Sequence, residues 1–155
     1  MAKLRLVNSL KQIKIAKELF REYAESLEIN LDFQDFEREF KELPGEYGPP
    51  SGRLFLAYYN TKPAGCVALK KMTNEICEMK RLFVRPEFRG KGIGKIFTKK
   101  IILEAKVIGY SKMRLDTISS MKAAVQIYRS FGFYETEPYY DNPVSDAIYF
   151  ELELK

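Results

Sequence analysis

The chain has 155 residues, of which 46% are hydrophobic and 30% charged, and its formal net charge is +5 at pH 7. These values predict a single globular domain over residues 1–155 without a membrane span, because no apolar run reaches the length of a bilayer helix. Two cysteines, Cys66 and Cys77, fit a reducing cytoplasm as buried structural thiols, and the absence of histidine argues against a metal site.

Short apolar segments and helical periodicity alternate along the first half of the chain. A capping box of Ser9 and Gln12 starts the first helix, in which apolar residues recur at helical spacing as far as Tyr23. In chain order we predict a strand at 4–7, that helix, a short helix at 32–43, a breaker-rich loop at 44–52, and strands at 53–59, 64–72 and 75–84. Tight turns between the last three strands favour an antiparallel meander.

Helices and strands alternate in the second half. In chain order we predict a helix at 93–110 that stops near Gly109, a strand at 112–117, a helix at 120–133 that ends near Gly132, and strands at 133–140 and 147–154. A right-handed crossover is required if the strands of the unit 75–117 are parallel. The order predicts an α/β (α+β) fold, with a mixed, mostly antiparallel sheet of about seven strands and helices on both faces.

The segment RGKGIGK at residues 89–95 packs three glycines among four basic residues, between a predicted strand and a predicted helix. Its spacing fits neither a P-loop nor the dinucleotide-binding fingerprint. Free N–H groups at a helix start, together with Arg89 and Lys91, would bind a compact polyanion such as a pyrophosphate. A glycine-rich turn with solvated charges is the other interpretation of this segment.

Residues 80–100 hold the one local excess of basic side chains, which makes nucleic acid an alternative partner. Binding of a single strand would need aromatic residues among these cations. Phe83 and Phe97 fit core positions better, so we expect no nucleic-acid partner.

Two motifs in register resemble a known family. VRPEFRGKGIG at residues 84–94 and, after one strand, AxxIYxxxGF from Ala124 to Phe133 are similar to the GCN5-related N-acetyltransferases (GNAT superfamily). The resemblance covers roughly residues 53–154. It implies splayed central strands, acetyl-CoA as donor, and acetyl transfer to a primary amine by direct attack in a ternary complex. It also implies a possible homodimer, with the strand at 147–154 as an edge.

The resemblance assigns roles to individual residues. The pyrophosphate of acetyl-CoA would be bound by Arg89, Gly90, Lys91, Gly92, Ile93, Gly94 and Lys95, and the pantetheine arm by the backbone of Leu82, Phe83 and Val84. Tyr128 matches the family tyrosine that protonates the leaving thiolate, although it also fits an apolar packing position beside Ala124 and Phe131. A backbone N–H near Leu82 or Phe83 would polarise the thioester carbonyl.

Two positions leave alternatives open. Strand alternation predicts that Glu78 shares a face with Lys80, Leu82 and Val84. Glu78 there resembles the base of histone-acetylating members, or it forms an ion pair with a neighbouring lysine. Met121 stands where the family often has asparagine, and a nearby serine, Ser119 or Ser120, would have to replace that contact. The departure keeps a non-catalytic acyl-CoA sensor as the alternative function.

The acceptor site is expected in the segments 42–52 and 137–147. Aromatic walls and hydrogen bonds would come from Tyr47, Tyr139, Tyr140 and Asn142, and a cationic amine would be attracted by Glu42, Glu46 and Asp141. Ordinary turn chemistry explains the same residues equally well. The sequence does not distinguish a small amine, an amino acid and a protein N-terminus.

Overall fold

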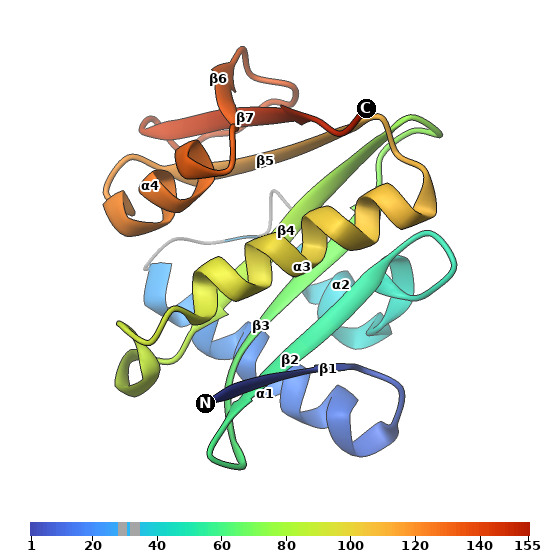
Figure 1. The fold of residues 1–155 in the computed structure, drawn as a ribbon, viewed down its shortest axis with the longest axis vertical. Coiled ribbons are helices and arrows are strands. Elements are labelled where there is room, and N and C mark those ends of the chain that lie inside the picture. Colours follow the sequence, from blue (N-terminus) through green and yellow to red (C-terminus); the bar gives the residue numbers. More distant parts are fainter. Residues whose placement is uncertain (28–30, 32–34) are drawn as a thin grey trace.

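The computed structural model describes residues 1–27, 31 and 35–155, which form four α-helices and one sheet of seven strands (Figure 1). The strands are β1 (Ala2–Leu6), β2 (Arg53–Tyr59), β3 (Lys62–Lys71), β4 (Ile76–Val84), β5 (Lys112–Ile118), β6 (Tyr134–Thr136) and β7 (Ala147–Glu153). The helices are α1 (Leu10–Leu27), α2 (Phe36–Glu42), α3 (Ile93–Ile108) and α4 (Lys122–Ser130), with 3-10 turns η2 (Gly45–Tyr47) and η3 (Pro86–Phe88).

The strand order is β1-β2-β3-β4-β5-β7-β6, and β4 with β5 is the parallel pair within this described sheet. Helix α3 connects these two parallel strands and lies in front of the sheet in Figure 1. Helices α1 and α2 lie behind it, so both faces are covered. The predicted mixed, mostly antiparallel α/β architecture is confirmed.

Local signals set the helix ends. The N–H of Gln12 donates to Ser9 Oγ at 3.2 Å, which is the first bond of a capping box. The Gln12 side chain accepts at 2.8 Å from the N–H of Asn8, one residue before the N-cap. Gly109 ends α3 with a φ of 112°, in the left-handed region that favours glycine. The predicted start of α1 and end of α3 are confirmed.

Some predicted boundaries differ from the structure. The strand predicted at 133–140 forms only as β6, and Pro138, which has no N–H for a ladder, lies in the irregular segment after it. The predicted loop at 44–52 contains the turn η2. The first part of the helix predicted at 32–43, Phe33 included, lies outside the described residues, and α2 begins at Phe36.

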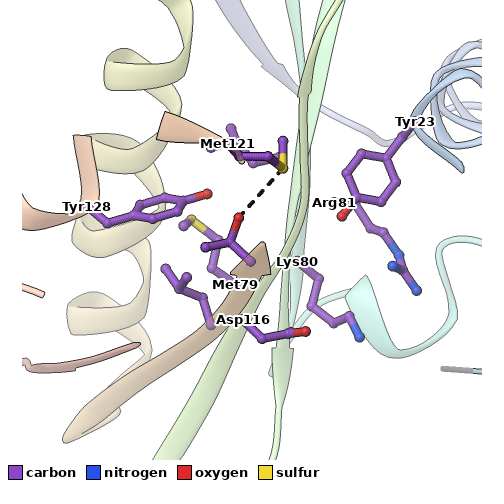
Figure 2. A pocket seen from close by; sticks show the side chains of 10 residues that line it. Tyr23, Met79, Lys80, Arg81, Asp116, Met121 and Tyr128 are labelled. Atoms are coloured by element: carbon purple, nitrogen blue, oxygen red, sulfur yellow. Dashed lines mark hydrogen bonds between the residues drawn. The ribbon is translucent and has the colours of Figure 1, made fainter. Parts of the chain in front are cut away.

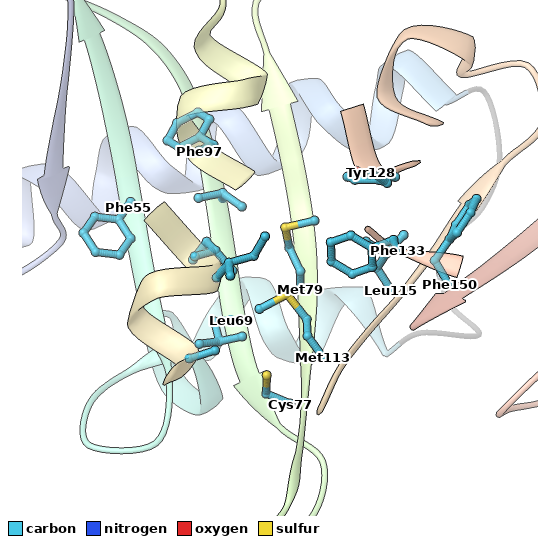
Figure 3. Close-up of a cluster of buried hydrophobic side chains, with 14 of the residues drawn as sticks. Phe55, Leu69, Cys77, Met79, Phe97, Met113, Leu115, Tyr128, Phe133 and Phe150 are labelled. Atoms are coloured by element: carbon cyan, nitrogen blue, oxygen red, sulfur yellow. The ribbon is translucent and has the colours of Figure 1, made fainter. Parts of the chain in front are cut away.

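Apolar side chains form a core on each face of the sheet. The core toward α3 and α4 includes Phe55, Phe97, Met113, Leu115 and Phe150 (Figure 3). The core toward α1 and α2 includes Leu19, Phe20, Leu56 and Phe83. Phe83 and Phe97 are thus core residues, as predicted, and do not offer exposed rings to nucleic acid.

Both cysteines are buried and free. Cys77 lies in the core toward α3 and Cys66 in the core toward α1, which confirms the prediction of structural thiols. Burial raises the pKa of both thiols, that of Cys77 to about 12. Neither thiol is therefore a nucleophile at neutral pH.

The parallel strands β4 and β5 pair only at their starts, where residues 76–78 lie beside 112–114. Beyond Glu78 and Arg114 the two strands diverge, and Figure 1 shows β4 and β5 running apart. The predicted splay of the central strands is confirmed. The divergence leaves the later backbone groups of β4 without a partner on β5.

A bulge in β4 accompanies the splay. Arg81 has a φ of 59°, and the register with β3 shifts there, because Cys66 pairs with Phe83 while Ala68 pairs with Lys80. An extra residue in one strand increases the local twist and bends the strand. The bulge therefore turns the second half of β4 relative to its first half.

The bulge reverses which face the later residues of β4 occupy. Cys77 packs in the core toward α3, so alternation turns Glu78 and Lys80 toward α1 and α2. Leu82 and Val84 pack against the core toward α3 instead. The prediction that Glu78 shares a face with Leu82 and Val84 is wrong, because the extra residue at the bulge shifts the alternation by one.

Strand β7 is not an edge of the sheet. It pairs with β5 along its length and with β6 at residues 149–151, so the outer strands are β1 and β6. The expectation that 147–154 is a free edge for dimer pairing is wrong for this reason. Among the described residues no helix combines the length and apolarity needed to cross a bilayer, and no cluster of acidic or cysteine side chains suits a metal.

Candidate active site

A cleft opens where β4 and β5 part, enclosing about 450 Å³ of empty space with its open mouth included. Its walls come from α1, β4, β5 and the start of α4. The lining residues are Tyr23, Met79, Lys80, Arg81, Leu82, Leu115, Asp116, Thr117, Met121 and Tyr128 (Figure 2). A hydroxyl, a carboxylate and an ammonium group thus converge on one concave site with apolar walls, as in many ligand sites.

Tyr128 reaches the cleft from α4. Its ring packs against Phe133 and Phe150, with centroids 5.8 and 6.2 Å away, and 5% of the residue is exposed. Its hydroxyl points into the cleft in Figure 2, and no group in the described part of the chain hydrogen bonds to it. Burial raises its pKa, so the hydroxyl keeps its proton at neutral pH.

Asp116 is the carboxylate that lines the cleft. It lies on β5, directly after the buried Leu115, so the alternation of the strand turns it away from the core toward α3. Its Oδ2 accepts hydrogen bonds from the Tyr140 hydroxyl at 2.6 Å and from Asn142 Nδ2 at 3.4 Å. Oδ1 has no partner among the described residues and is available to a ligand.

Glu78 lies where β4 and β5 begin to diverge, outside the lining of the cleft. Its Oε2 accepts a hydrogen bond of 2.8 Å from the Tyr139 hydroxyl, and its Oε1 is 3.9 Å from Lys70 Nζ. Each interpretation of Glu78 thus has a supporting contact. Lys70 on the neighbouring strand is the partner for an ion pair, and the bond from Tyr139 connects Glu78 to the residues predicted for the acceptor site.

Lys80 is the cleft cation without an ion pair to any described residue. The side chain is half-buried, and burial lowers its pKa, which the carboxylates of Glu78 and Asp116 only partly offset. An ammonium group rarely stays in such surroundings without an anion. The prediction from sequence did not include Lys80 as a site residue.

Arg81, at the bulge, holds the acceptor-side helices on the sheet. Its Nε donates to Glu39 Oε2 at 2.7 Å and its Nη2 to Glu39 Oε1 at 3.2 Å, with both side chains largely buried. Its guanidinium also lies 5.7 Å from the ring centroid of Tyr23 on α1. This residue therefore ties α1, α2 and β4 together beside the cleft.

The glycine turn begins α3 in an open, exposed conformation. Gly90 and Gly92 have φ values of 81° and 78°, and a Cβ on either would meet no atom within 4 Å. Gly92 is the N-cap of α3, and no side chain caps the helix there. The first N–H groups of the helix therefore face open space, as an anion site requires.

The basic side chains of this turn lie at the surface. Arg89 donates from Nε to the Val84 carbonyl at 3.0 Å, so it fastens the turn to the end of β4. Lys91 lies over the Tyr59 ring at 5.0 Å, and Lys95 is exposed on α3. Each leaves hydrogen-bond donors free for a phosphate.

The other predicted donor-site residues would act through their backbones. The side chains of Ile93 and Phe83 are buried in the two cores, so only their main-chain groups face a ligand. A Cβ at Gly94 would come within 3.3 Å of Ile127, so this glycine allows α3 to pack against α4. Leu82 alone among the predicted β4 residues lines the cleft.

Met121 occupies the N-cap of α4 and lines the cleft. Its sulfur accepts a weak hydrogen bond of 3.6 Å from Thr117 Oγ1, shown as the dashed line in Figure 2. Ser119 and Ser120 are exposed and do not line the cleft. Neither serine therefore replaces the asparagine contact within the cleft.

The four predicted acceptor residues divide into two groups. Tyr139, Tyr140 and Asn142 lie together and hydrogen bond to the carboxylates of β4 and β5. Tyr47 is buried in the core toward α1, where it contacts Phe20 and its hydroxyl donates to Glu39. The structure does not bring Tyr47 to the cleft.

Comparison with known proteins identifies the same family along most of the chain. A sequence model of the acetyltransferase (GNAT) family matches residues 14–133. An N-acetyltransferase of Schizosaccharomyces pombe is 42% identical over 89% of this chain and 86% of its own length. A Dictyostelium discoideum N-acetyltransferase is 34% identical over 97% of this chain and 99% of its own length.

Solved structures share the fold. An acetyltransferase of the GNAT family from Staphylococcus aureus superposes with a TM-score of 0.81 over the full length of both chains at 22% identity. A Campylobacter jejuni N-acetyltransferase in complex with acetyl coenzyme A has a TM-score of 0.61 at 21% identity, over 99% of both chains. With the family match, the close relatives and the splayed sheet in agreement, this chain belongs to the GNAT family of acetyltransferases.

Proposed function

We propose that this acetyltransferase moves the acetyl group of acetyl-CoA to a primary amine by direct attack, with Tyr128 as the acid and Asp116 as the carboxylate that faces the amine. One observation carries the proposal: the splay of β4 and β5 brings the Tyr128 hydroxyl and the Asp116 carboxylate into one cleft. An acid and an anion facing the same space are what amine acylation requires.

The residues along the cleft fit acetyl-CoA. Main-chain groups of β4 beyond Glu78 are unpaired with β5, and they are free to bond the amides of the pantetheine arm. The open turn at Gly90 and Gly92 leaves room for the pyrophosphate next to the first N–H groups of α3. When bound, acetyl-CoA supplies a thioester carbonyl that a neutral amine attacks.

Tyr128 acts as the general acid. Its hydroxyl is protonated at neutral pH, has no competing partner in the described residues, and faces the cleft. A backbone N–H of the unpaired part of β4, near Leu82 or Phe83, polarises the carbonyl in the way of an oxyanion hole. The hydroxyl then serves the departing thiolate as proton donor.

Asp116 binds the incoming amine through its free Oδ1 and accepts its proton. Tyr140 and Asn142 hold the other oxygen, so the carboxylate is oriented before the amine arrives. Glu78 does not face the amine directly, because it lies outside the lining of the cleft. It accepts a hydrogen bond from the Tyr139 hydroxyl instead. We therefore treat Glu78 as a positioning residue.

Direct attack requires a ternary complex. No cysteine lines the cleft in the described structure, and both thiols lie in the two cores, so a covalent acetyl-cysteine intermediate has no support. Initial velocities measured with acetyl-CoA and an amine varied together test this order. Intersecting double-reciprocal lines support the proposal, whereas parallel lines would indicate a covalent acetyl-enzyme and overturn it.

A further inference from the structure

The cleft contains one cation that the transfer reaction does not use and that forms no ion pair with a described residue. Lys80 lines the cleft on the same side of β4 as Glu78, toward α1 and α2, and it has no ion pair among the described residues. Its neighbours are differently placed, because Arg81 is neutralised by Glu39 and Lys70 lies near Glu46 and Glu78.

The surroundings of Lys80 call for an anion. Burial and the nearby Arg81 lower its pKa, and the carboxylates of Glu78, Asp116 and Glu39 offset this only in part, so no described group in direct contact compensates the half-buried ammonium. Asp116 does not supply that compensation by contact, since its Oδ2 is held by Tyr140 and Asn142. A carboxylate that enters with the acceptor would supply it.

The acceptor side of the cleft thus offers an anion and a cation close together. Figure 2 shows Asp116 and Lys80 lining the same part of the cleft, and the carboxylate is close enough to affect the pKa of the lysine. A primary amine suits Asp116 and an adjacent carboxylate suits Lys80. A peptide N-terminus presents an amide instead of a carboxylate next to its amine and leaves Lys80 unpaired.

We propose that the acceptor is a free amino acid, whose amine is held by Asp116 and whose carboxylate is bound by Lys80. This inference rests on the proposed acetyltransferase function and narrows its acceptor to one chemical class. Lys80 is then a specificity-determining residue, because an amine without a carboxylate would leave its charge desolvated and unpaired.

The test compares each standard L-amino acid with its α-carboxamide, by release of the coenzyme A thiol from acetyl-CoA. For the preferred side chain, we expect the acid to exceed the amide in kcat/KM by about tenfold or more, the effect of a charge-assisted hydrogen bond. The α-amine of the carboxamide is less basic than the α-amine of the free amino acid, so a larger fraction of it is neutral at a given pH. This difference favours the carboxamide and therefore cannot produce the expected preference for the acid.

Variants of Lys80 test whether this residue causes the preference for the acid over the amide. Lys80→Gln should bring the ratio of the two kcat/KM values to about one, while Lys80→Arg, which keeps the charge, should retain part of it. Lys106→Gln, at an exposed lysine on α3, is the matched control and should keep the wild-type ratio. A partial loss of folding would lower both rates by the same factor, so the ratio reports the acceptor preference of the folded enzyme alone.

Two results would overturn the inference alone: equal or faster turnover of the amides by the wild type, or an unchanged ratio in Lys80→Gln. In both cases acetyl transfer to amines is still observed, so the proposed function stands. Absence of thiol release with every amine would instead overturn the proposed function, and this inference with it.

Discussion

The Tyr140 hydroxyl donates a hydrogen bond of 2.6 Å to Asp116 Oδ2. It joins the loop after β6 to the middle of β5, and Asn142 strengthens the junction by donating to the Tyr140 oxygen at 2.9 Å. The same oxygen of Asp116 takes both donors, so Oδ1 is directed to other partners. The loop thus orients the carboxylate that we assign to the amine.

Asp116→Asn should lower kcat/KM by roughly a hundredfold near neutral pH, the range that general base catalysis supplies. The loss should shrink as pH rises toward the pKa of the acceptor ammonium, because an amine that is already neutral needs no base. A pH–rate profile of kcat/KM for the wild type and this variant measures it. A defect of constant size across the profile would make Asp116 a structural residue.

Glu78→Gln distinguishes the role of Glu78 from that of Asp116. As a positioning residue that holds Tyr139, Glu78 should give a smaller loss of kcat/KM that does not depend on pH, and Tyr139→Phe should give a similar one. The same pH–rate profiles provide the measurement. A Glu78→Gln defect that disappears at high pH would show instead that Glu78 is the base, as the family resemblance suggests.

Tyr128→Phe should reduce kcat by about a hundredfold or more, because it removes the acid and keeps the ring. Affinity for acetyl-CoA, measured by calorimetry, should change little, since the hydroxyl acts mainly in the transition state. The matched control is Tyr134→Phe, whose hydroxyl donates to Glu151 and Glu153 outside the cleft. An equal kcat in Tyr128→Phe and the wild type would refute the assignment.

The two ends of α3 provide a matched pair for the anion site. Gly92 and Gly109 both have positive φ, and a Cβ on either meets no neighbouring atom. Alanine at either position should therefore cost about 1 kcal/mol of stability from the backbone alone. Only Gly92→Ala should also weaken acetyl-CoA binding, by about tenfold or more. Equal affinities of the two variants in calorimetry would argue against the turn as the pyrophosphate site.

Glu39→Gln should destabilise the protein by about 3 kcal/mol, because it removes the Glu39 charge that faces the buried Arg81 guanidinium. Urea unfolding measures this change. Glu37→Gln, at an exposed residue of the same helix, should change stability by less than about 0.5 kcal/mol. Similar midpoints for both variants would mean that the Arg81–Glu39 pair does not fasten α2 to the sheet.

Local patterns were enough to predict the elements and part of the site. The glycine turn and the Tyr128 motif depend on a few adjacent residues whose backbone needs are visible in the sequence, such as the positive φ at Gly92. The capping box at Ser9 is local in the same sense. Strand order beyond the meander and the position of β7 required tertiary pairing.

The missed residues depend on geometry that the sequence does not show. Asp116 and Lys80 become cleft residues only because β4 and β5 part after Glu78. The available signal was a charged residue directly after a buried apolar one in each strand, Lys80 after Met79 and Asp116 after Leu115. Alternation failed past Arg81 because nothing in the local sequence marks the bulge. The assignment of Tyr47 to the acceptor site is wrong. Its burial beneath α1 results from long-range packing, which no local sequence pattern shows.

The most direct test of the central claim is the rate of coenzyme A thiol release, measured with wild type and Tyr128→Phe over a panel of amines. We predict release that depends on the amine, matches the acetylated amine detected by mass spectrometry, and falls by about a hundredfold in Tyr128→Phe. Binding of acetyl-CoA without release dependent on any amine would contradict the claim, and would identify the protein as a non-catalytic acyl-CoA sensor.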